Sequence, residues 1–223
     1  MTIRRSARAA TLLTACLMMG FGLACREAET PMAPETAVAP PPAEAPPEMI
    51  ALFNGEDLTG WETVGDADWR VEDGLLIGKQ GPNNESGDLL SEEEFDDFEL
   101  VVTYRVVWPA NSGIWFRYQS PGQAYQADIL EYPDPVAYCG TLYCPGKMFL
   151  FTNEDRDLVN IDGWNTMRVR AEGDRLQIWL NDFPIGDVRD DTSATGQVGI
   201  QVHDGDQFGD MKIIVRRFLI RPL

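Results

Sequence analysis

The strongest constraint on the fold is a strict alternation of apolar and polar residues in many short segments. Residues 98–107 read FELVVTYRVV, and similar alternation returns at residues 164–172 and 176–180. Alternation with a period of two gives a β-strand one buried face and one polar face. Turn signals separate these segments, among them Asp73-Gly74, Gly173-Asp174 and Asn181-Asp182. The sequence therefore predicts an all-β chain folded as a two-sheet antiparallel sandwich.

One predicted hairpin, from Asn111 to Glu131, carries an unusual number of polar residues. Period-two alternation predicts that one of its faces enters the core and that the other is polar. The core face is expected to hold Ile114, Phe116, Tyr118, Tyr125, Ala127 and Ile129. The polar face is expected to hold Arg117, Gln126 and Asp128, with Glu131 at the strand end. This face is either a solvated surface of the sheet or a binding site.

Residues 1–24 are typical of a secretory signal, because arginines precede a short apolar run that is too short to span a membrane. The end of this signal together with the next residue, Gly22-Leu23-Ala24-Cys25, is similar to a bacterial lipobox. It predicts a lipid anchor on Cys25 and a place in the cell envelope. Cys16 is a second candidate, although cleavage there would leave an apolar tail, and cleavage to a soluble periplasmic protein is a further alternative.

Residues 25–48 are rich in Pro, Ala and Glu and have no apolar periodicity, so we expect an extended tether. Residues 49–223 should then form a single domain. The chain has a formal net charge of −18, which disfavours nucleic acid and anionic lipid head groups as partners. Contact with a membrane is therefore expected only through the lipid anchor.

Two groups outside the hairpin have alternative interpretations. Cys139 and Cys144 lie close enough in sequence to suggest a disulfide in an oxidising compartment, or else two free thiols. A zinc site is a poor alternative, since the chain has a single histidine. The acidic residues Asp204, Asp206 and Asp210 could bind Ca²⁺ or form an ordinary polar loop.

Eight segments of the predicted domain form an ordered series. They read LFNGEDLTGW, WRVEDGLLIG, GDLLS with DFELVVTYRV, NSGIWFR, YQADILE, GTLY, WNTMRVRAEGDRLQIWLND and GQVGIQVHD. This series resembles the bacterial 3-keto-disaccharide hydrolase domain family across residues 50–223. The resemblance implies a jelly roll similar to concanavalin and laminin-G domains. The family's central strand usually reads Glu-x-Gln-Ile-x-Asp, whereas this chain has Gln126, Asp128 and Glu131 there, so its carboxylates are placed differently.

The resemblance also implies a reaction on 3-keto-glycosides. A ketone at C3 acidifies the proton on C2, so a base can start an elimination that releases the group on C1. His203, the only histidine, follows Gln201 in a pattern similar to the family's Gln-x-His. We predict that His203 or Glu131 is the base and that Arg117, alone or with a divalent cation, stabilises the enolate. No other cofactor is indicated.

The remaining candidates are residues that would hold an oligosaccharide or glycoside. Gln126, Asp128 and Gln201 are predicted to bind its hydroxyls, and Trp115 and Trp179 to stack on its rings, although either tryptophan could instead pack beneath a loop. The leading hypothesis is a cell-envelope enzyme that cleaves 3-keto-glycosides. The alternatives are a non-catalytic carbohydrate-binding module and a structural envelope domain.

Overall fold

The computed structural model describes residues 48–223. The predicted signal, the tether up to residue 47 and both candidate lipidation sites, Cys16 and Cys25, lie outside the described residues. Fifteen strands make up two antiparallel sheets, joined by loops and three short 3₁₀ helices. The predicted all-β, two-sheet antiparallel jelly-roll sandwich is confirmed.

The first sheet has eight strands. Its path runs β13 (Phe183–Arg189), β12 (Arg175–Leu180), β11 (Asn165–Glu172), β6 (Phe98–Val107), β15 (Lys212–Pro222), β4 (Leu75–Lys79) and β3 (Asp68–Glu72), with β1 (Ile50–Ala51) paired to β15. Neighbours on this path come from distant parts of the chain. The β6–β15 pair, for example, joins Lys212 to Val107 and Pro222 to Phe98.

The second sheet has seven strands. Its order is β10 (Met148–Asn153), β9 (Val136–Cys144), β8 (Gln123–Pro133), β7 (Asn111–Ser120), β14 (Gly196–Val202), β5 (Gly87–Phe95) and β2 (Trp61–Gly65). The three 3₁₀ helices are η1 (Pro82–Asn84), η2 (Arg156–Leu158) and η3 (Asp206–Phe208). None of the helices within residues 48–223 is long and apolar enough to cross a membrane.

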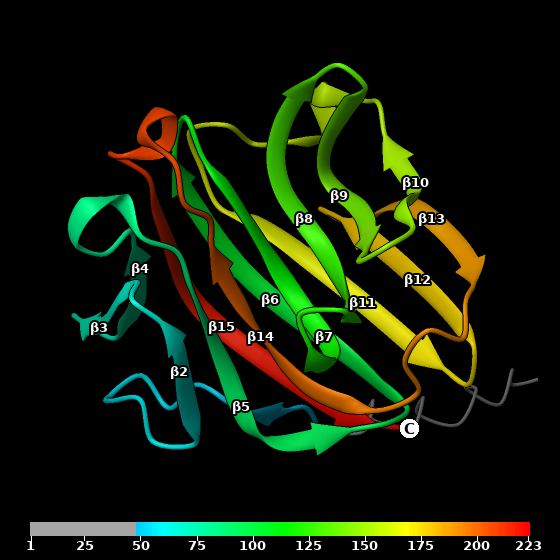
Figure 1. Ribbon diagram of the computed structural model, residues 1–223. Helices are drawn as coiled ribbons and strands as arrows, with labels where there is room; N and C mark the ends of the chain where they lie inside the picture. The colour runs from blue at the N-terminus through cyan, green and yellow to red at the C-terminus, as the bar shows by residue number, and fades with distance from the viewer. Residues whose placement is uncertain (1–47) are drawn as a thin grey trace, which may run out of the picture. The chain divides into compact units, whose positions relative to one another are not determined.

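The core lies between the two sheets. Figure 1 shows β5, β7 and β14 of the seven-stranded sheet in front of β6, β11 and β15 of the other sheet. Residues that alternate toward the gap are fully buried, such as Leu100 and Val102 on β6 and Ala127 and Ile129 on β8. Burial of these rows fixes the register of each strand, because a slip of one residue would expose its apolar face. The polar rows are therefore turned outward.

One residue interrupts the alternation of β7. Arg117 has a left-handed backbone with φ of 48°, and the pairing of β7 with β8 shifts between Phe116 and Ser120. A bulge of this kind re-aims the side chains that follow it. Tyr118 therefore lies on the outer side with Trp115 instead of entering the core with Phe116. The chain approaches Gly196 so closely here that a Cβ on Gly196 would lie 2.5 Å from the carbonyl oxygen of Tyr118.

The predicted disulfide is wrong. Cys139 and Cys144 are buried free thiols on the same strand, β9. The two cysteines are five positions apart along the strand, which corresponds to roughly 16 Å of extended chain, whereas the Cα atoms of a disulfide lie about 6 Å apart. Closeness in sequence is not closeness in space when the intervening residues form a strand. Both cysteines serve as apolar members of the core.

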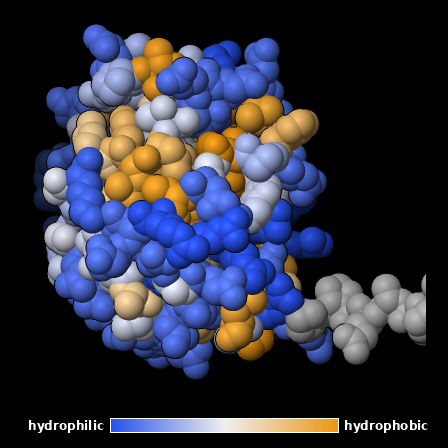
Figure 2. Space-filling model, turned by 90° about the vertical axis from the view of Figure 1, so that its right-hand side faces the viewer, coloured by the Kyte–Doolittle hydropathy of each residue, from blue (hydrophilic) through white to orange (hydrophobic). Residues whose placement is uncertain are grey.

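Figure 2 shows the side of the molecule that carries β10 and β13, the end strands of the two sheets. A group of apolar side chains gathers on this side among polar ones. Met148 at the start of β10 and Phe183 at the start of β13 are both exposed large apolar residues. This side of the molecule therefore exposes apolar side chains to water, which is typical of surfaces that bind a ligand or a partner.

Candidate functional site

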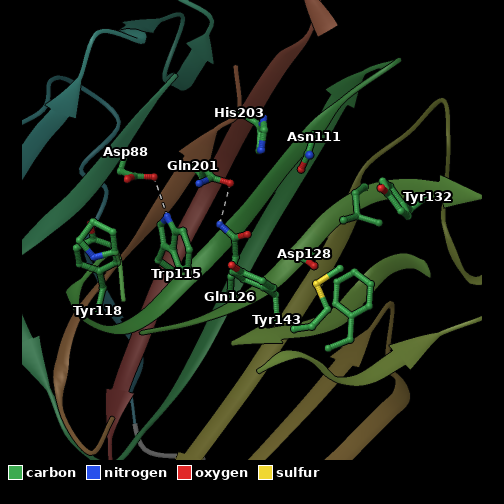
Figure 3. A pocket seen from close by; sticks show the side chains of 14 residues that line it. Asp88, Asn111, Trp115, Tyr118, Gln126, Asp128, Tyr132, Tyr143, Gln201 and His203 are labelled. Atoms are coloured by element: carbon green, nitrogen blue, oxygen red, sulfur yellow. Dashed lines mark hydrogen bonds between the residues drawn. The ribbon is translucent and has the colours of Figure 1, made fainter. Parts of the chain in front are cut away.

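A pocket of about 390 Å³ lies on the outer face of the seven-stranded sheet. Six strands, β5, β7, β8, β9, β10 and β14, contribute to its lining together with Pro121 and His203, and Figure 3 shows these side chains. The lining consists of Asp88, Asn111, Trp115, Tyr118, Pro121, Gln126, Asp128, Leu130, Tyr132, Tyr143, Met148, Phe149, Gln201 and His203. Of the residues predicted to form one site, the pocket brings together Gln126, Asp128, Gln201, His203 and Trp115, whereas Arg117, Glu131 and Trp179 are not among its lining residues.

The middle of the pocket is formed by two amide side chains. Gln126 on β8 donates from Nε2 to Oε1 of Gln201 on β14 at 3.1 Å, across the intervening strand β7. A Cβ at Gly113 on β7 would lie 2.4 Å from the side chain of Gln126. The absence of a side chain at Gly113 therefore lets the Gln126–Gln201 pair cross the sheet. The pair leaves further amide donors and acceptors free for a ligand.

Asp128 is a buried carboxyl group that faces this pocket. It is only 3% exposed, and burial raises its pKa well above the usual range of an aspartate. No hydrogen bond or ion pair from another residue of the 48–223 segment counters that effect. Carboxyl groups with a raised pKa in a pocket are typical of functional sites, because a fold gains nothing from burying an unpaired acid.

A second acid, Asp88 on β5, holds Trp115 in place. The indole Nε1 of Trp115 donates to Oδ1 of Asp88 at 2.7 Å. Burial raises the pKa of Asp88, and the hydrogen bond from Trp115 acts in the opposite direction. Trp115 also contacts Tyr118 and Tyr143 through their rings, at centroid distances of 5.5 Å and 6.5 Å. These contacts fix the indole as a rigid wall of the pocket.

His203 follows directly after β14 and lies at one edge of the pocket, near Gln201 and Asn111 (Figure 3). Its side chain is 43% exposed. Its Nδ1 lies 2.8 Å from the carboxylate and 2.9 Å from the carbonyl oxygen of Asp204. Both partners accept hydrogen bonds, so Nδ1 carries a proton and Nε2 is the nitrogen left to accept one. This arrangement suits a general base.

Arg117 does not belong to the pocket, so the prediction for it is wrong. It is 1% exposed and donates to the carbonyl oxygens of Asp96, Gly173 and Ser193 and, at 3.0 Å, to Oδ1 of Asp97. The left-handed backbone at Arg117 directs the side chain to these loops instead of outward. Burial lowers its pKa, and the nearby Asp97 counters this effect. Arg117 is therefore a structural residue that joins the loops around Asp96, Gly173 and Ser193.

Glu131 and Trp179 also lie elsewhere. Glu131 is exposed and pairs with Nε of Arg156. Side chains of β8 alternate between two faces, and Asp128 and Leu130 lie on the face of the pocket. Glu131, three positions after Asp128, therefore points to the other face. Trp179 lies on β12 of the eight-stranded sheet, where the guanidinium of Arg168 stacks on its ring at 3.7 Å. Both predictions of a place in the pocket are wrong.

The sequence reading missed several members of the pocket. Tyr143, Met148 and Phe149 come from β9 and β10, which reach the site only through the pairing of the sheet. Asp88 had a local signal, since alternation places it opposite the buried Leu89 on β5.

The possible Ca²⁺ ligands do not assemble into a cluster. The described part of the chain contains no group of three or more His, Cys, Asp or Glu side chains arranged to hold a metal ion. Asp206 instead accepts a hydrogen bond from the amide of Asn84 at 2.8 Å. The arrangement fits the ordinary polar loop that was the alternative.

Sequence comparison decides the family. Residues 48–218 match the model of the 3-keto-alpha-glucoside-1,2-lyase-like domain. The chain belongs to this family. The match spans nearly all of the sandwich, and it agrees with the ordered series of segments from LFNGEDLTGW to GQVGIQVHD. The pocket described above is therefore the candidate site of a 3-keto-disaccharide hydrolase-like domain.

Individual relatives are more distant. A 3-keto-disaccharide hydrolase of Bacteroides thetaiotaomicron (strain VPI-5482) is 30% identical over 76 residues, which cover 30% of this chain and 26% of that protein. The match thus spans about a quarter of the length of this curated relative.

Two solved structures show the fold in other proteins. A glycosyl hydrolase candidate from Parabacteroides distasonis ATCC 8503 has a TM-score of 0.62 and 18% identity, over 79% of this chain and 100% of that one. The carbohydrate-binding module CBM66 of Bacillus subtilis has a TM-score of 0.50 and 19% identity, over 72% and 94%. These likenesses concern the fold alone.

Proposed function

We propose that the pocket on the seven-stranded sheet binds a 3-keto-glycoside and breaks its glycosidic bond by elimination, followed by addition of water. The family supports the substrate class. The observation that carries the proposal is the carboxyl group of Asp128, which is buried in the pocket without a partner among the described residues. Such a group is costly to the fold and useful to a reaction that must donate a proton.

In this proposal His203 acts as the base and Asp128 acts as the acid. His203 is accessible and has Nε2 free, so it takes the proton from C2, and the electron pair of the C2–H bond forms an enolate with the C3 ketone. The enolate then collapses to a C1–C2 double bond as the bond from C1 to the leaving oxygen breaks. Asp128, whose pKa is raised, is the acid that protonates that oxygen.

Addition of water reverses these roles. Water adds its oxygen to C1, and the carboxylate of Asp128 takes the proton that the water loses. The imidazolium of His203 returns its proton to C2, so both residues regain their starting state. Asn111, Gln126 and Gln201 supply neutral donors for the oxygen on C3, where negative charge develops. Arg117 has no part in this scheme.

A turnover assay tests the proposal. The purified full chain should release the aglycone from a 3-keto-glucoside and leave the unoxidised glucoside intact, because only the ketone acidifies C2. His203→Gln should lower turnover by about a hundredfold or more, the usual scale for loss of a general base. Absence of turnover on any 3-keto-glycoside would contradict the proposal.

A binding module is the second candidate, since the fold is shared with CBM66. It predicts that wild type and His203→Gln bind oxidised and unoxidised glycosides alike and that neither is cleaved. The aromatic wall of Trp115 and Tyr118 would serve such a module as well as an enzyme. The unpaired Asp128 favours the enzyme, because a binding site would gain more from an acid whose hydrogen bonds are satisfied.

A further inference from the structure

The lining of the pocket is divided into a polar half and an apolar half. The polar half contains Asp88, Asn111, Gln126, Gln201 and His203 beside the aromatic rings of Trp115 and Tyr118. The apolar half contains Leu130, Tyr132, Tyr143, Met148 and Phe149, contributed by β8, β9 and β10. Figure 3 shows Asp128 on the side of Gln126 that faces Tyr132, away from Asp88, Trp115 and Tyr118.

We infer that the apolar half seats the leaving group of the substrate, and that this group is an apolar, ring-bearing alcohol instead of a second sugar. The inference rests on the proposed function and deepens it. The polar half has amides and an imidazole for the hydroxyls and ketone of the oxidised sugar. Asp128, on the border, is placed to protonate the oxygen that joins the two parts.

Hydrogen-bonding capacity argues against a sugar in the apolar half. A hexose leaving group carries several hydroxyls, and each one buried without a partner costs free energy. The side chains of this half offer only the hydroxyls of Tyr132 and Tyr143 beside the carboxyl of Asp128. Leu130, Met148 and Phe149 have no hydrogen-bonding group suited to a hydroxyl.

Exposure argues for an apolar occupant. Met148 is 53% exposed and Tyr132 is 44% exposed at the outer edge of the pocket. The side of the molecule that carries β10 has further apolar residues at its surface (Figure 2). An aromatic or cycloaliphatic ring placed here would remove its own apolar surface and that of Met148 from water, which favours binding.

Two substrates test the inference in the full-length protein: the 3-keto-glucosides of benzyl alcohol and of glucose, with the same anomeric configuration. We expect kcat/KM to be about tenfold or more higher for the benzyl compound, the scale of burying one ring. Phe149→Ala should lower that value about tenfold and lower the disaccharide value by a clearly smaller factor. Phe183→Ala is the matched control, because Phe183 is exposed but does not line the pocket.

Equal or higher kcat/KM for the disaccharide, or an equal loss with both substrates in Phe149→Ala, would overturn the inference and leave the proposed function intact. If neither compound reacts, the proposed function fails, and calorimetric binding of unoxidised benzyl glucoside and methyl glucoside then tests the part of the inference that places an apolar ring in the apolar half. Tighter binding of the benzyl compound that disappears in Phe149→Ala supports it, and equal affinities contradict it.

Discussion

Asp128 and Arg117 are both buried ionisable residues of neighbouring strands, but their surroundings differ. Arg117 donates to three carbonyl oxygens and to the carboxylate of Asp97. Asp128 receives no such compensation from the described residues. A buried charge with several partners holds loops together, whereas a buried acid without partners is available to a ligand. This contrast separates the structural residue from the candidate catalytic one.

For Arg117 the expected effect of substitution is loss of stability. Arg117→Met leaves three carbonyl oxygens and the carboxylate of Asp97 without their donor, and we expect the free energy of unfolding to fall by roughly 3 kcal/mol. Urea denaturation measures this change. Turnover per folded molecule should stay near that of the wild type, and a large loss of turnover at unchanged stability would return Arg117 to the mechanism.

Asp190 provides a pH-dependent prediction. Burial alone would raise its pKa, but hydrogen bonds from Lys147, Thr192 and Tyr125 lower it to about 2. A carboxyl group with a lowered folded-state pKa stabilises the protein above its unfolded value near 3.8 and loses that effect as the pH falls toward 2. Asp190→Asn should therefore cost roughly 2 kcal/mol at pH 7.

The difference between wild type and Asp190→Asn should shrink between about pH 4 and pH 2 in urea denaturation. Asp191→Asn is the matched control, since Asp191 is the exposed neighbour in the same loop. If the difference in the free energy of unfolding between wild type and Asp190→Asn does not change with pH, then the ionised form of Asp190 is not the source of the stabilisation.

Single strands show where sequence reasoning succeeds. The alternation predicted the bounds of β6, Phe98–Val107, and the outward row of Gln126 and Asp128 on β8, because burial of one face fixes every second residue. It failed at β7, where Arg117 takes a left-handed conformation that arginine rarely adopts and that no local signal announces. Tyr118 consequently faces the pocket and not the core.

The cysteines of β9 give a prediction at the scale of one strand. Burial raises the pKa of the Cys139 thiol to about 12, so this cysteine should react slowly in the native protein. We expect N-ethylmaleimide to modify Cys139 and Cys144 only after unfolding, with no reductant needed. A cross-linked peptide containing both cysteines in the mass spectrum of the non-reduced protein would contradict this expectation.

For the whole molecule, alternation tells which residues face outward but not on which of two sheets they lie. Trp179 and Trp115 both face outward, yet only Trp115 lies on the seven-stranded sheet with the pocket. The pairing of distant strands decides this, and it depends on packing across the entire sandwich. The fold class therefore followed from the sequence more completely than the composition of the pocket.

The lipid anchor is a proposal that concerns the chain as a whole. If Cys25 is acylated in the cell envelope, a palmitate analogue should label the wild type and the Cys16→Ser variant, but not Cys25→Ser. An unlabelled wild type would point to a soluble protein, and loss of label in Cys16→Ser alone would move the anchor to that residue.

A comparison of Asp128→Asn with Glu131→Gln tests the proposed catalytic role of Asp128. Both replace an acid by its amide on β8, but Asp128 is buried in the pocket and Glu131 is exposed outside it. Because burial raises the pKa of Asp128, its carboxyl group lowers stability increasingly as the pH rises above its unfolded value. We predict that Asp128→Asn unfolds at a higher temperature than wild type at pH 7 and loses turnover on a 3-keto-glycoside by about a hundredfold or more, while Glu131→Gln keeps its turnover. Wild-type turnover in Asp128→Asn would contradict a catalytic role for Asp128.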